Sequence, residues 1–376
     1  MDWGGDGEEP CRCLWMVLQE AGAVARVSGC RAVWVRVALI CPYSIGPVRG
    51  NITTVRRITA HLPEAGVLAD MLPLDRLTLA EQQALLDRQR PLLLHAFHAF
   101  HSGPVAQELA RCLGIPYLIT ITGSDLFDPL LRDAPATRRA MAGAASITCF
   151  DPLMARRLVE FFPDVAGRIA VIPQGVQPLP VSEPLCRAAD EFVAFLPAAL
   201  RPVKGVVAAL DALAPLAEEF PSLRLVLAGG ALDPEYARIV GERAACLAWV
   251  RLLGDIPWQR MGALFTAADL VLNCSHFEGG MANSLLEAMS MARPVLARDV
   301  SGNRSLIRHG RTGWLYGSDD EMRTLVRELL ADPAVGNRMG ELGRSYVLKR
   351  CSPFREARRY ARVYGRVLGG APPLRE

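Results

Sequence analysis

The chain has 376 residues, 51% of them hydrophobic and 22% charged, and a formal net charge of +3. This length predicts two domains, and the composition excludes a disordered chain and gives no reason to expect nucleic acid as a partner. Ten cysteines without CxxC spacing predict reduced thiols, and no apolar run reaches the ~18 residues of a membrane span. Residues 1–33 lack the pattern of a signal peptide, so we interpret them as an extension, either disordered or a start-site artefact, and expect a cytoplasmic protein.

A strand at residues 34–40, a glycine-containing loop and a helix beginning near Thr53 open the first domain. This order is typical of the first unit of a nucleotide-binding α/β domain, but the loop lacks the GxGxxG pattern of dinucleotide sites. Gly50 and Asn51 end the loop. They either bring backbone N–H groups close to a phosphate or sugar or form a plain turn with a capping residue.

The next strand, residues 92–98, carries His95 and His98. Side chains an odd number of positions apart point to opposite faces of a strand, so we expect these histidines to contact substrate or to be structural, and we expect no metal site. The strand that follows ends in Thr122 and Asp125. Polar residues at the carboxyl end of a buried parallel strand lie where such sheets bind ligands.

A proline-rich segment, residues 173–180, precedes a second alternation of strands and helices. Its first strand, residues 192–198, is followed by Arg201 and Lys204. Two cations three residues apart, at the carboxyl end of a strand and before a helix, are well placed to neutralise a diphosphate. Exposed cations are also commonly solvated without a ligand, so both interpretations stand at this point.

A glycine turn follows the apolar strand at residues 269–275 and precedes another helix. The turn contains Glu278, and either Asn283 or Ser284 is the expected N-cap, with Glu287 in the first turn of the helix. A helix N-terminus behind a glycine turn presents unpaired N–H groups and a partial positive charge, which favour an anion such as a diphosphate. The alternative is a capped helix in which Glu287 only complements the helix dipole.

The alternation in each half predicts an α/β fold of two doubly wound parallel-sheet domains that face each other across a cleft. The segment at residues 353–367 carries five arginines, which either touch an anionic membrane or lie in solvent on a helix that packs back on the first domain. The expected segments are an extension, a first domain, a hinge linker, a second domain and a C-terminal helix, at residues 1–33, 34–176, 177–190, 191–348 and 349–376.

Four motifs together resemble the carboxyl-terminal domain of retaining glycosyltransferases of family 4, which have the GT-B fold. They are Arg201-Pro202-Val203-Lys204-Gly205, Leu225-Val226-Leu227-Ala228-Gly229-Gly230, Gly254-Asp255-Ile256-Pro257 and the stretch from Glu278 to Met289. The resemblance covers roughly residues 36–348. It implies two Rossmann-like domains, of which the first binds the acceptor and the second binds the nucleotide-sugar donor.

The resemblance also implies roles for the matching residues. Arg201 and Lys204 would bind the donor diphosphate, Glu278 would lie near the donor sugar and the reacting centre, and Glu287 would bind the nucleotide ribose. Glu278, Arg201 and Lys204 are the expected catalytic residues. The other implied donor contacts come from a base-recognition loop, the glycine turn and a loop of the first domain: Gly254, Ile256, Gly279, Gly280, Met281, Ala282, Asn283, Gly50 and Asn51.

The chain departs from the family pattern at two places. Eight residues, instead of the usual seven, separate Glu278 from Glu287, which affects the placing of Glu278. Many members also carry a histidine where this chain has Thr122 and Gly123. The acceptor-side contacts are therefore expected from His95, His98, Thr122 and Asp125.

The resemblance implies transfer of a hexosyl unit, with retention, from a nucleotide diphosphate sugar, expected to be UDP-linked, to a small-molecule or glycan acceptor. A narrower set of motifs, including Gly229-Gly230 and Glu278-Gly279-Gly280, looks like the selenosugar synthases, which join a UDP-sugar to selenophosphate. A catalytically silent sugar-nucleotide binder is the alternative of another class. No cofactor is expected, and because the sequence contains no D-x-D triplet, the two cations are expected to replace a metal at the diphosphate.

Overall fold

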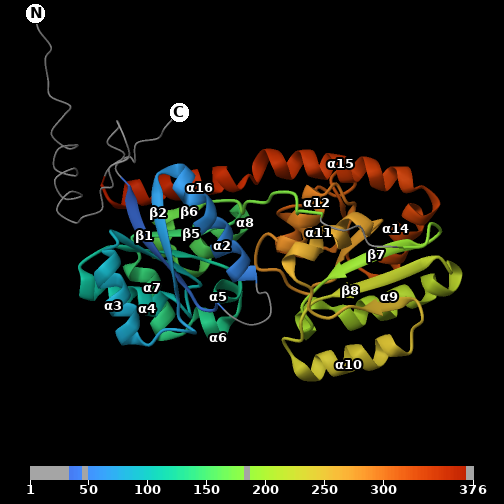
Figure 1. Ribbon diagram of the computed structural model, residues 1–376, viewed down its shortest axis with the longest axis horizontal. Coiled ribbons are helices and arrows are strands. Elements are labelled where there is room, and N and C mark those ends of the chain that lie inside the picture. The colour runs from blue at the N-terminus through green and yellow to red at the C-terminus, as the bar shows by residue number, and fades with distance from the viewer. Residues whose placement is uncertain (1–33, 45–49, 182–186, 370–376) are drawn as a thin grey trace, which may run out of the picture. The chain divides into compact units, whose positions relative to one another are not determined.

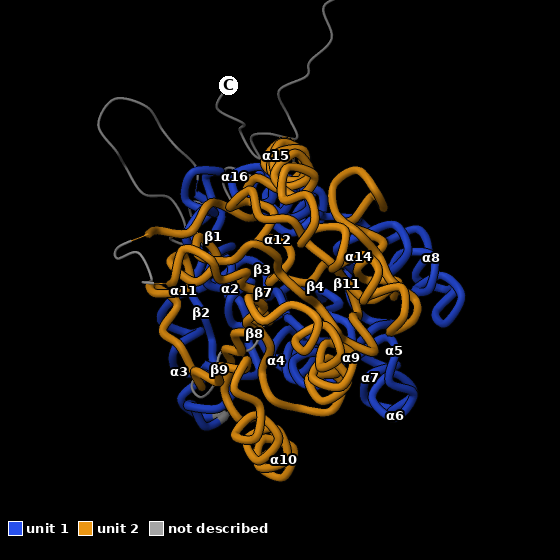
Figure 2. The backbone as a smooth tube through the Cα atoms, turned by 90° about the vertical axis from the view of Figure 1, so that its right-hand side faces the viewer, with its two compact units in different colours: residues 1–46, 50–175, 353–376 blue, residues 47–49, 176–352 orange. Residues whose placement is uncertain are grey.

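The computed structural model describes residues 34–44, 50–181 and 187–369, and the predicted extension at residues 1–33 lies outside this range. The chain forms two compact units (Figure 2). Unit 1 contains residues 50–175 and 353–369 together with the first strand, and unit 2 contains residues 176–352. None of the described helices combines the length and the apolar character needed to cross a membrane.

Unit 1 is built on a six-stranded parallel sheet with the order β2-β1-β3-β4-β5-β6 (Figure 1). Its strands are β1 (Val35–Cys41), β2 (Val67–Pro73), β3 (Leu93–Phe97), β4 (Tyr117–Thr120), β5 (Ser146–Cys149) and β6 (Ile169–Val171). Its helices are α2 (Gly50–His61), α3 (Leu79–Gln89), α4 (Gly103–Leu113), α5 (Ser124–Phe127), α6 (Pro129–Arg132), α7 (Pro135–Gly143), α8 (Pro152–Phe161) and α16 (Pro353–Val367), with 3₁₀ turns at Leu62–Ala65 and Pro163–Arg168.

The last helix of the chain, α16, completes the core of unit 1. Its side chains Tyr360 and Tyr364 are fully buried in one hydrophobic cluster with residues of β1 and α2. Glu356, only 1% exposed, forms a two-pronged ion pair with Arg57 of α2, at 2.8 and 3.0 Å. The chain returns to unit 1 at Pro353, which packs closely against Gly175. A Cβ at Gly175 would lie 2.6 Å from the Cα of Pro353, so only glycine fits at this position.

Unit 2 also has a six-stranded parallel sheet, with the order β12-β11-β10-β7-β8-β9. Its strands are β7 (Phe192–Pro197), β8 (Leu223–Ala228), β9 (Val250–Leu252), β10 (Leu270–Asn273), β11 (Val295–Arg298) and β12 (Trp314–Tyr316). Its helices are α9 (Val206–Glu219), α10 (Pro234–Ala245), α11 (Trp258–Ala267), α12 (Asn283–Ser290), α13 (Ser301–Arg304), α14 (Asp319–Ala331) and α15 (Pro333–Arg350), with a 3₁₀ turn at Pro202–Lys204. Helices α9, α10 and α14 pack on one face of the sheet, and α11 and α12 lie on the other (Figure 1).

The two sheets confirm the predicted pair of doubly wound domains. Most strands were predictable from their apolar sequences. Helices cover both faces of each sheet, so the side chains on both sides of a strand must be apolar, as in β1 and β10. Strand β2 and helix α3 were not predicted from the sequence. β2 is an edge strand, half-buried along most of its length and containing Asp70, so it lacks such a run. α3 does carry a readable signal, a capping box in which Thr78 and Glu81 satisfy each other's backbone N–H groups.

Candidate functional site

The candidate site lies where the strand order of unit 2 reverses. β7 and β10 are neighbours in the sheet although they are far apart in the chain. Parallel sheets bind ligands outside the carboxyl ends of the strands at such a point, because the flanking connections leave toward opposite faces. β7 leads to the segment 201–205, and β10 leads to the segment 274–282. The fold thus brings the two predicted donor-binding stretches to one edge.

Lys204 and Glu278 form an ion pair at this edge. The Lys204 Nζ donates to Glu278 Oε1 over 2.6 Å. Ser275 Oγ at 2.7 Å and Asn273 Nδ2 at 3.2 Å donate to the same oxygen. The side chains of Lys204 and Glu278 are 19% and 13% exposed. Glu278 Oε2 accepts no hydrogen bond from the described residues, so it is the oxygen that a ligand hydroxyl can approach.

The surroundings of Glu278 favour its charged form. Burial alone would raise its pKa, but the Lys204 charge and the hydrogen bonds from Lys204, Ser275 and Asn273 outweigh burial and lower the pKa. The carboxylate is therefore ionised at neutral pH. A fixed negative charge with one oxygen held in place is suited to accept a hydrogen bond from a sugar hydroxyl.

The backbone around Glu278 rests on α13. A Cβ at Gly302 would lie 2.5 Å from the carbonyl oxygens of both Glu278 and Gly280. The next residue, Asn303, is fully buried and donates from Nδ2 to Asn273 Oδ1 over 3.3 Å. The turn that contains the extra residue is therefore held by close backbone contact and by an amide that also orients Asn273, a partner of Glu278.

The Lys204 loop is fixed against the end of β10 in a similar way. Gly205 has a φ of 64°, and a Cβ there would lie 2.2 Å from the carbonyl oxygen of Cys274. The backbone N–H of His276 donates to the carbonyl oxygen of Val203 over 2.9 Å. These two contacts keep Lys204 within reach of Glu278, and a larger residue than glycine at position 205 would separate the loops.

The helix after the glycine turn, α12, begins one residue earlier than its predicted cap. Ala282 occupies the N-cap position, and its carbonyl oxygen accepts from the N–H groups of Leu285 and Leu286, so Asn283 is the first helical residue. The prediction of Asn283 or Ser284 as N-cap was therefore wrong. Glu287, half-buried, falls in the second turn rather than the first as predicted, because the first turn spans residues 283–286.

The N-terminus of α12 still offers backbone donors to an anion. The first N–H groups of an α-helix have no partner within the helix. Gly279 and Gly280 are half-buried, and Met281 and Ala282 are buried, so the turn brings its backbone close to the helix start. With Lys204 nearby, this edge of the sheet carries positive charge and N–H donors together.

The remaining predicted donor residues of unit 2 lie on other loops at the carboxyl ends of its strands. Arg201, just after β7, is exposed, which suits a side chain that closes on a ligand. Gly254 follows β9 with a φ of 69°, and its carbonyl oxygen accepts from the N–H of Gly229 over 2.8 Å. Ile256 is half-buried in the same turn. The structure places these residues without showing what they bind.

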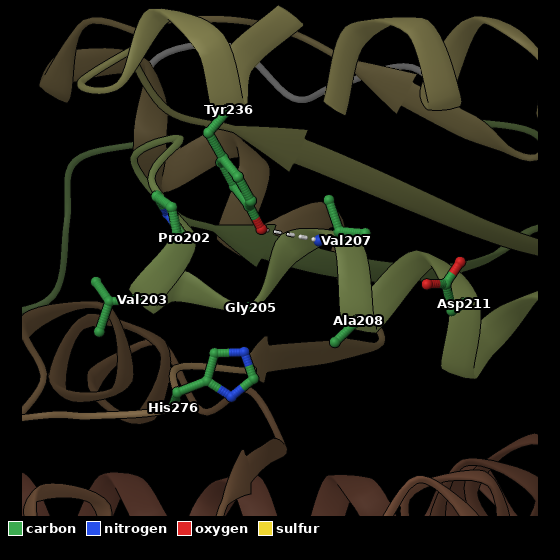
Figure 3. A pocket seen from close by; sticks show the side chains of 8 residues that line it. All are labelled: Pro202, Val203, Gly205, Val207, Ala208, Asp211, Tyr236 and His276. Atoms are coloured by element: carbon green, nitrogen blue, oxygen red, sulfur yellow. Dashed lines mark hydrogen bonds between the residues drawn. The ribbon is translucent and has the colours of Figure 1, made fainter. Parts of the chain in front are cut away.

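A shallow depression of about 560 Å³ adjoins the Lys204 loop (Figure 3). The Tyr236 hydroxyl, from α10, accepts a hydrogen bond from the N–H of Val207 over 3.1 Å, and His276 borders the opposite side. Apolar groups form most of the wall, so the depression offers van der Waals contact rather than charge. The lining residues are Pro202, Val203, Gly205, Val207, Ala208, Asp211, Tyr236 and His276.

His95 of unit 1, predicted on the acceptor side, is fully buried. Its ring nitrogens are 2.8 Å from the Tyr364 hydroxyl and 2.6 Å from Thr120 Oγ1. Burial lowers its pKa well below the ordinary value for histidine. Both nitrogens are engaged inside the core, so we assign His95 to the packing of α16 and not to acceptor contact.

The other predicted acceptor-side residues hold the loops that follow β3 and β4. Both carboxylate oxygens of Asp125 accept backbone N–H groups, from Thr122, Gly123 and Ala99. His98, 3% exposed with a φ of 86°, lies 3.0 Å from the Ser124 hydroxyl through Nε2. Of this set, only Thr122 is half-buried with a side chain that makes no hydrogen bond to the described residues.

Gly50 and Asn51 occupy the first turn of α2 rather than the end of a loop, because the helix begins three residues before its predicted start. Their backbone N–H groups are thus among the unpaired donors of a helix N-terminus. Among the residues that the structure describes, no three His, Cys, Asp or Glu side chains gather as they would around a metal ion.

Comparison with known proteins identifies the region that carries the site. Residues 191–332 match the profile of the family Glycosyl transferases group 1. The matched stretch contains Lys204, Glu278 and Glu287, as well as the Asn273, Ser275 and Asn303 side chains that hold Glu278 directly or through Asn273.

The fold of the described residues matches GT-B glycosyltransferase structures. A sucrose-phosphate synthase from Thermosynechococcus elongatus superposes with a TM-score of 0.75 at 20% identity, covering 89% of this chain and 99% of that one. HepE from Anabaena, solved in complex with UDP and glucose, superposes with a TM-score of 0.70 at 17% identity, covering 87% and 98%. In sequence, glycosyltransferase 1 domain-containing protein 1 of Xenopus tropicalis is 26% identical over 327 residues, 79% of this chain and 89% of that protein.

Three residues of the matched stretch that hold Glu278 in place were not predicted from the sequence. Asn273 and Ser275 lie at the carboxyl end of a buried strand, the position that had drawn attention to Thr122 in unit 1. The same rule applied to β10 would have found them. Asn303 carries no such local signal, because its contact with Asn273 joins segments thirty positions apart.

Proposed function

We propose that the protein transfers a hexosyl unit from a UDP-linked sugar to a small-molecule or glycan acceptor, with retention at the anomeric carbon and without a metal. The Lys204–Glu278 pair, at the strand-order reversal of a glycosyltransferase group 1 domain, carries the proposal. The fold relative HepE, whose crystals contain UDP and glucose, supports UDP as the nucleotide.

The leaving diphosphate gains negative charge in the transition state. In the proposed mechanism Arg201, Lys204 and the N-terminal N–H groups of α12 stabilise that charge. Donors fixed in advance in a partly desolvated site contribute more there than they would in water. Because two cations and a helix N-terminus supply this stabilisation, the proposal needs no metal, and transfer is expected to persist in a chelator.

Glu278 would hold the donor sugar through Oε2, the oxygen that the described residues leave without a hydrogen bond. Lys204 can turn toward the diphosphate because Ser275 and Asn273 still hold Oε1. Glu287 would contact the ribose, and the turn with Gly254 and Ile256 would contact the base. On the acceptor side, only Thr122 keeps a proposed contact; Gly50 and Asn51 stay predictions.

A screen of nucleotide sugars by thermal shift, followed by a turnover assay, tests the proposal. A ligand that binds only the folded protein raises its melting temperature. We expect UDP-sugars to raise it and Lys204→Met to abolish the effect. Lys349→Met, an exposed position on α15, removes the same charge and is the matched control. Absence of UDP binding would refute the proposal.

Turnover then separates an enzyme from a binder. Acceptors offered with the preferred donor should include simple sugars, glycan fragments and selenophosphate. We expect Glu278→Gln to lower transfer on the order of 10²-fold, comparable to loss of one aligned transition-state contact. A protein that binds UDP-sugar and turns over with no acceptor would be a silent binder, and consumption of selenophosphate would identify a selenosugar synthase.

A further inference from the structure

Helix α16 carries a row of arginines on the face opposite its buried side. Arg355, Arg362 and Arg366 are exposed, and Arg358 and Arg359 are half-buried. At 3.6 residues per turn these positions fall within an arc of about 100°, and the row is about 16 Å long. We call Arg355, Arg358, Arg359, Arg362 and Arg366 the arginine stripe.

Four of the five arginines in the arginine stripe have no carboxylate partner among the described residues. Among the described residues, Arg358, Arg359, Arg362 and Arg366 take part in no ion pair. The only acid on α16, Glu356, is buried and engaged by Arg57. Some exposed arginines elsewhere do face a carboxylate, as in the pairs Arg111–Glu108, Arg157–Glu160, Arg238–Glu235 and Arg243–Asp211. What sets the arginine stripe apart is the alignment of its arginines along one face of one helix.

The helix beneath the arginine stripe is held rigidly. Tyr360 and Tyr364 are fully buried along the opposite face, and Tyr364 is hydrogen-bonded to His95. The arginines are therefore presented as a straight row on a fixed support. Phe354, 39% exposed, lies beside the row, with the Arg358 guanidinium 5.5 Å from its ring centroid.

We propose that the arginine stripe docks the protein on a membrane surface that contains anionic lipids. A straight cationic row on the outer face of an embedded helix matches an extended anionic plane, and an exposed aromatic side chain at its edge suits the interfacial region. A nucleic-acid reader, by contrast, needs a protruding element with side chains that reach base edges in a groove.

The mode of docking follows from which face of α16 is buried. The apolar face packs on the core of unit 1, so the helix cannot insert it into lipid. Binding is therefore electrostatic, requires anionic lipid and weakens with salt, because the Debye length falls from about 10 Å at 0.1 M to about 3 Å at 1 M. Each arginine close to such a surface strengthens binding roughly 5-fold.

Flotation of the full chain with lipid vesicles tests the proposal. We expect binding to phosphatidylcholine vesicles that contain 30 mol% phosphatidylglycerol at 0.1 M salt, and little binding to pure phosphatidylcholine. Changing Arg358, Arg359, Arg362 and Arg366 to Gln should weaken binding roughly several hundred-fold, the product of four such factors. The corresponding Lys variant keeps the charge and should still bind.

A second quadruple variant matches the change in net charge. Arg111→Gln, Arg157→Gln, Arg238→Gln and Arg243→Gln remove four exposed, paired arginines outside the arginine stripe, and this variant should bind vesicles like the wild type. Equal loss in both variants would overturn the proposal, as would wild-type binding that persists in 1 M salt. Tighter, stripe-dependent binding to duplex DNA than to vesicles at equal salt would also overturn it, in favour of nucleic acid. The salt dependence of wild-type binding tests the proposal even if the Gln variant of the arginine stripe does not fold.

Discussion

At the scale of single residues, Glu278 depends on three partners from two different segments. Lys204 comes from the loop after β7, Ser275 and Asn273 come from β10 and its end, and all three donate to one oxygen. The lowered pKa of Glu278 follows from this arrangement, in which charge and hydrogen bonds outweigh the cost of burial. The residue is therefore ionised and oriented before any ligand arrives.

This arrangement makes stability depend on pH. Because the pKa of Glu278 is lowered by folding, the unfolded chain, with a glutamate pKa of about 4.3, takes up the proton first as pH falls. The stabilisation is complete above that pH and is lost as pH falls through the lower folded-state pKa. Urea denaturation at stepped pH should show a steeper loss of unfolding free energy below about pH 4.3 for the wild type than for Glu278→Gln. Parallel curves would contradict the ion pair.

Gly302 offers a test of how closely the glycine turn must be placed. In Gly302→Ala the new Cβ would lie 2.5 Å from two backbone oxygens, so the turn with Glu278 must shift. A shift of about 1 Å at a reacting centre can cost on the order of 10²-fold in rate. We expect the assay of sugar transfer to show such a loss while circular dichroism shows a folded protein.

The matched control for this change is Gly241→Ala in α10, where an added Cβ meets nothing within 4 Å. This substitution should leave transfer unchanged and stabilise the protein by about 0.5–1 kcal/mol, because alanine is the better helix former. If both alanine variants retained full transfer, the contact between Gly302 and the turn would have no role in placing Glu278.

At the scale of elements, the sequence predicts those whose pattern is strong and local. The two-face burial of β1 and β10 imposes apolar runs, and the ends of both strands agree with their predicted ranges to within two residues. Half-buried edge strand β2 has no such pattern. The N-cap of α12 was misplaced because Ala282 takes a position that sequence preference gives to polar residues.

The candidate site was predictable only in part, for a related reason. Lys204 and Glu278 each lie at a strand end that the apolar pattern reveals, but their 2.6 Å contact joins positions 74 residues apart. Whether an extra residue between Glu278 and Glu287 disturbs that contact depends on Gly302, in another element. Likewise, His95 looked like a ligand contact in its own strand, and only Tyr364, 269 positions later, shows that it is structural.

Helix α16 illustrates how an element distant in sequence stabilises unit 1. Glu356→Ala leaves Arg57 without its bidentate carboxylate partner in a site where the arginine side chain is 13% exposed. Breaking a buried pair in this way typically costs about 3–5 kcal/mol, and the partial exposure of Arg57 points to the lower end. Equilibrium denaturation should show this loss, whereas Glu64→Ala, which removes a carboxylate from an exposed pair with His61, should change stability by less than about 1 kcal/mol.

At the scale of the whole molecule, the two units have separate cores. The cluster built on β1, α2 and α16 contains residues of unit 1 alone, and the cluster built on α9, α10 and α14 contains residues of unit 2 alone. The proposed UDP contacts with Lys204, Glu278 and Glu287 all belong to unit 2. A substitution in unit 1 and a ligand that binds unit 2 should therefore shift different unfolding transitions.

Calorimetry of the full chain can resolve this separation, since domains with their own cores commonly unfold as distinct cooperative transitions. UDP at about 100 times its dissociation constant should stabilise the transition of unit 2 by about 2.7 kcal/mol, and Glu356→Ala should lower only the other transition. When UDP is added to Glu356→Ala, the transition of unit 2 should rise and the transition that the substitution lowered should stay where it is. If UDP and the substitution moved the same transition, the nucleotide would have to bind through unit 1 as well, and the assignment of the UDP contacts to unit 2 would be wrong.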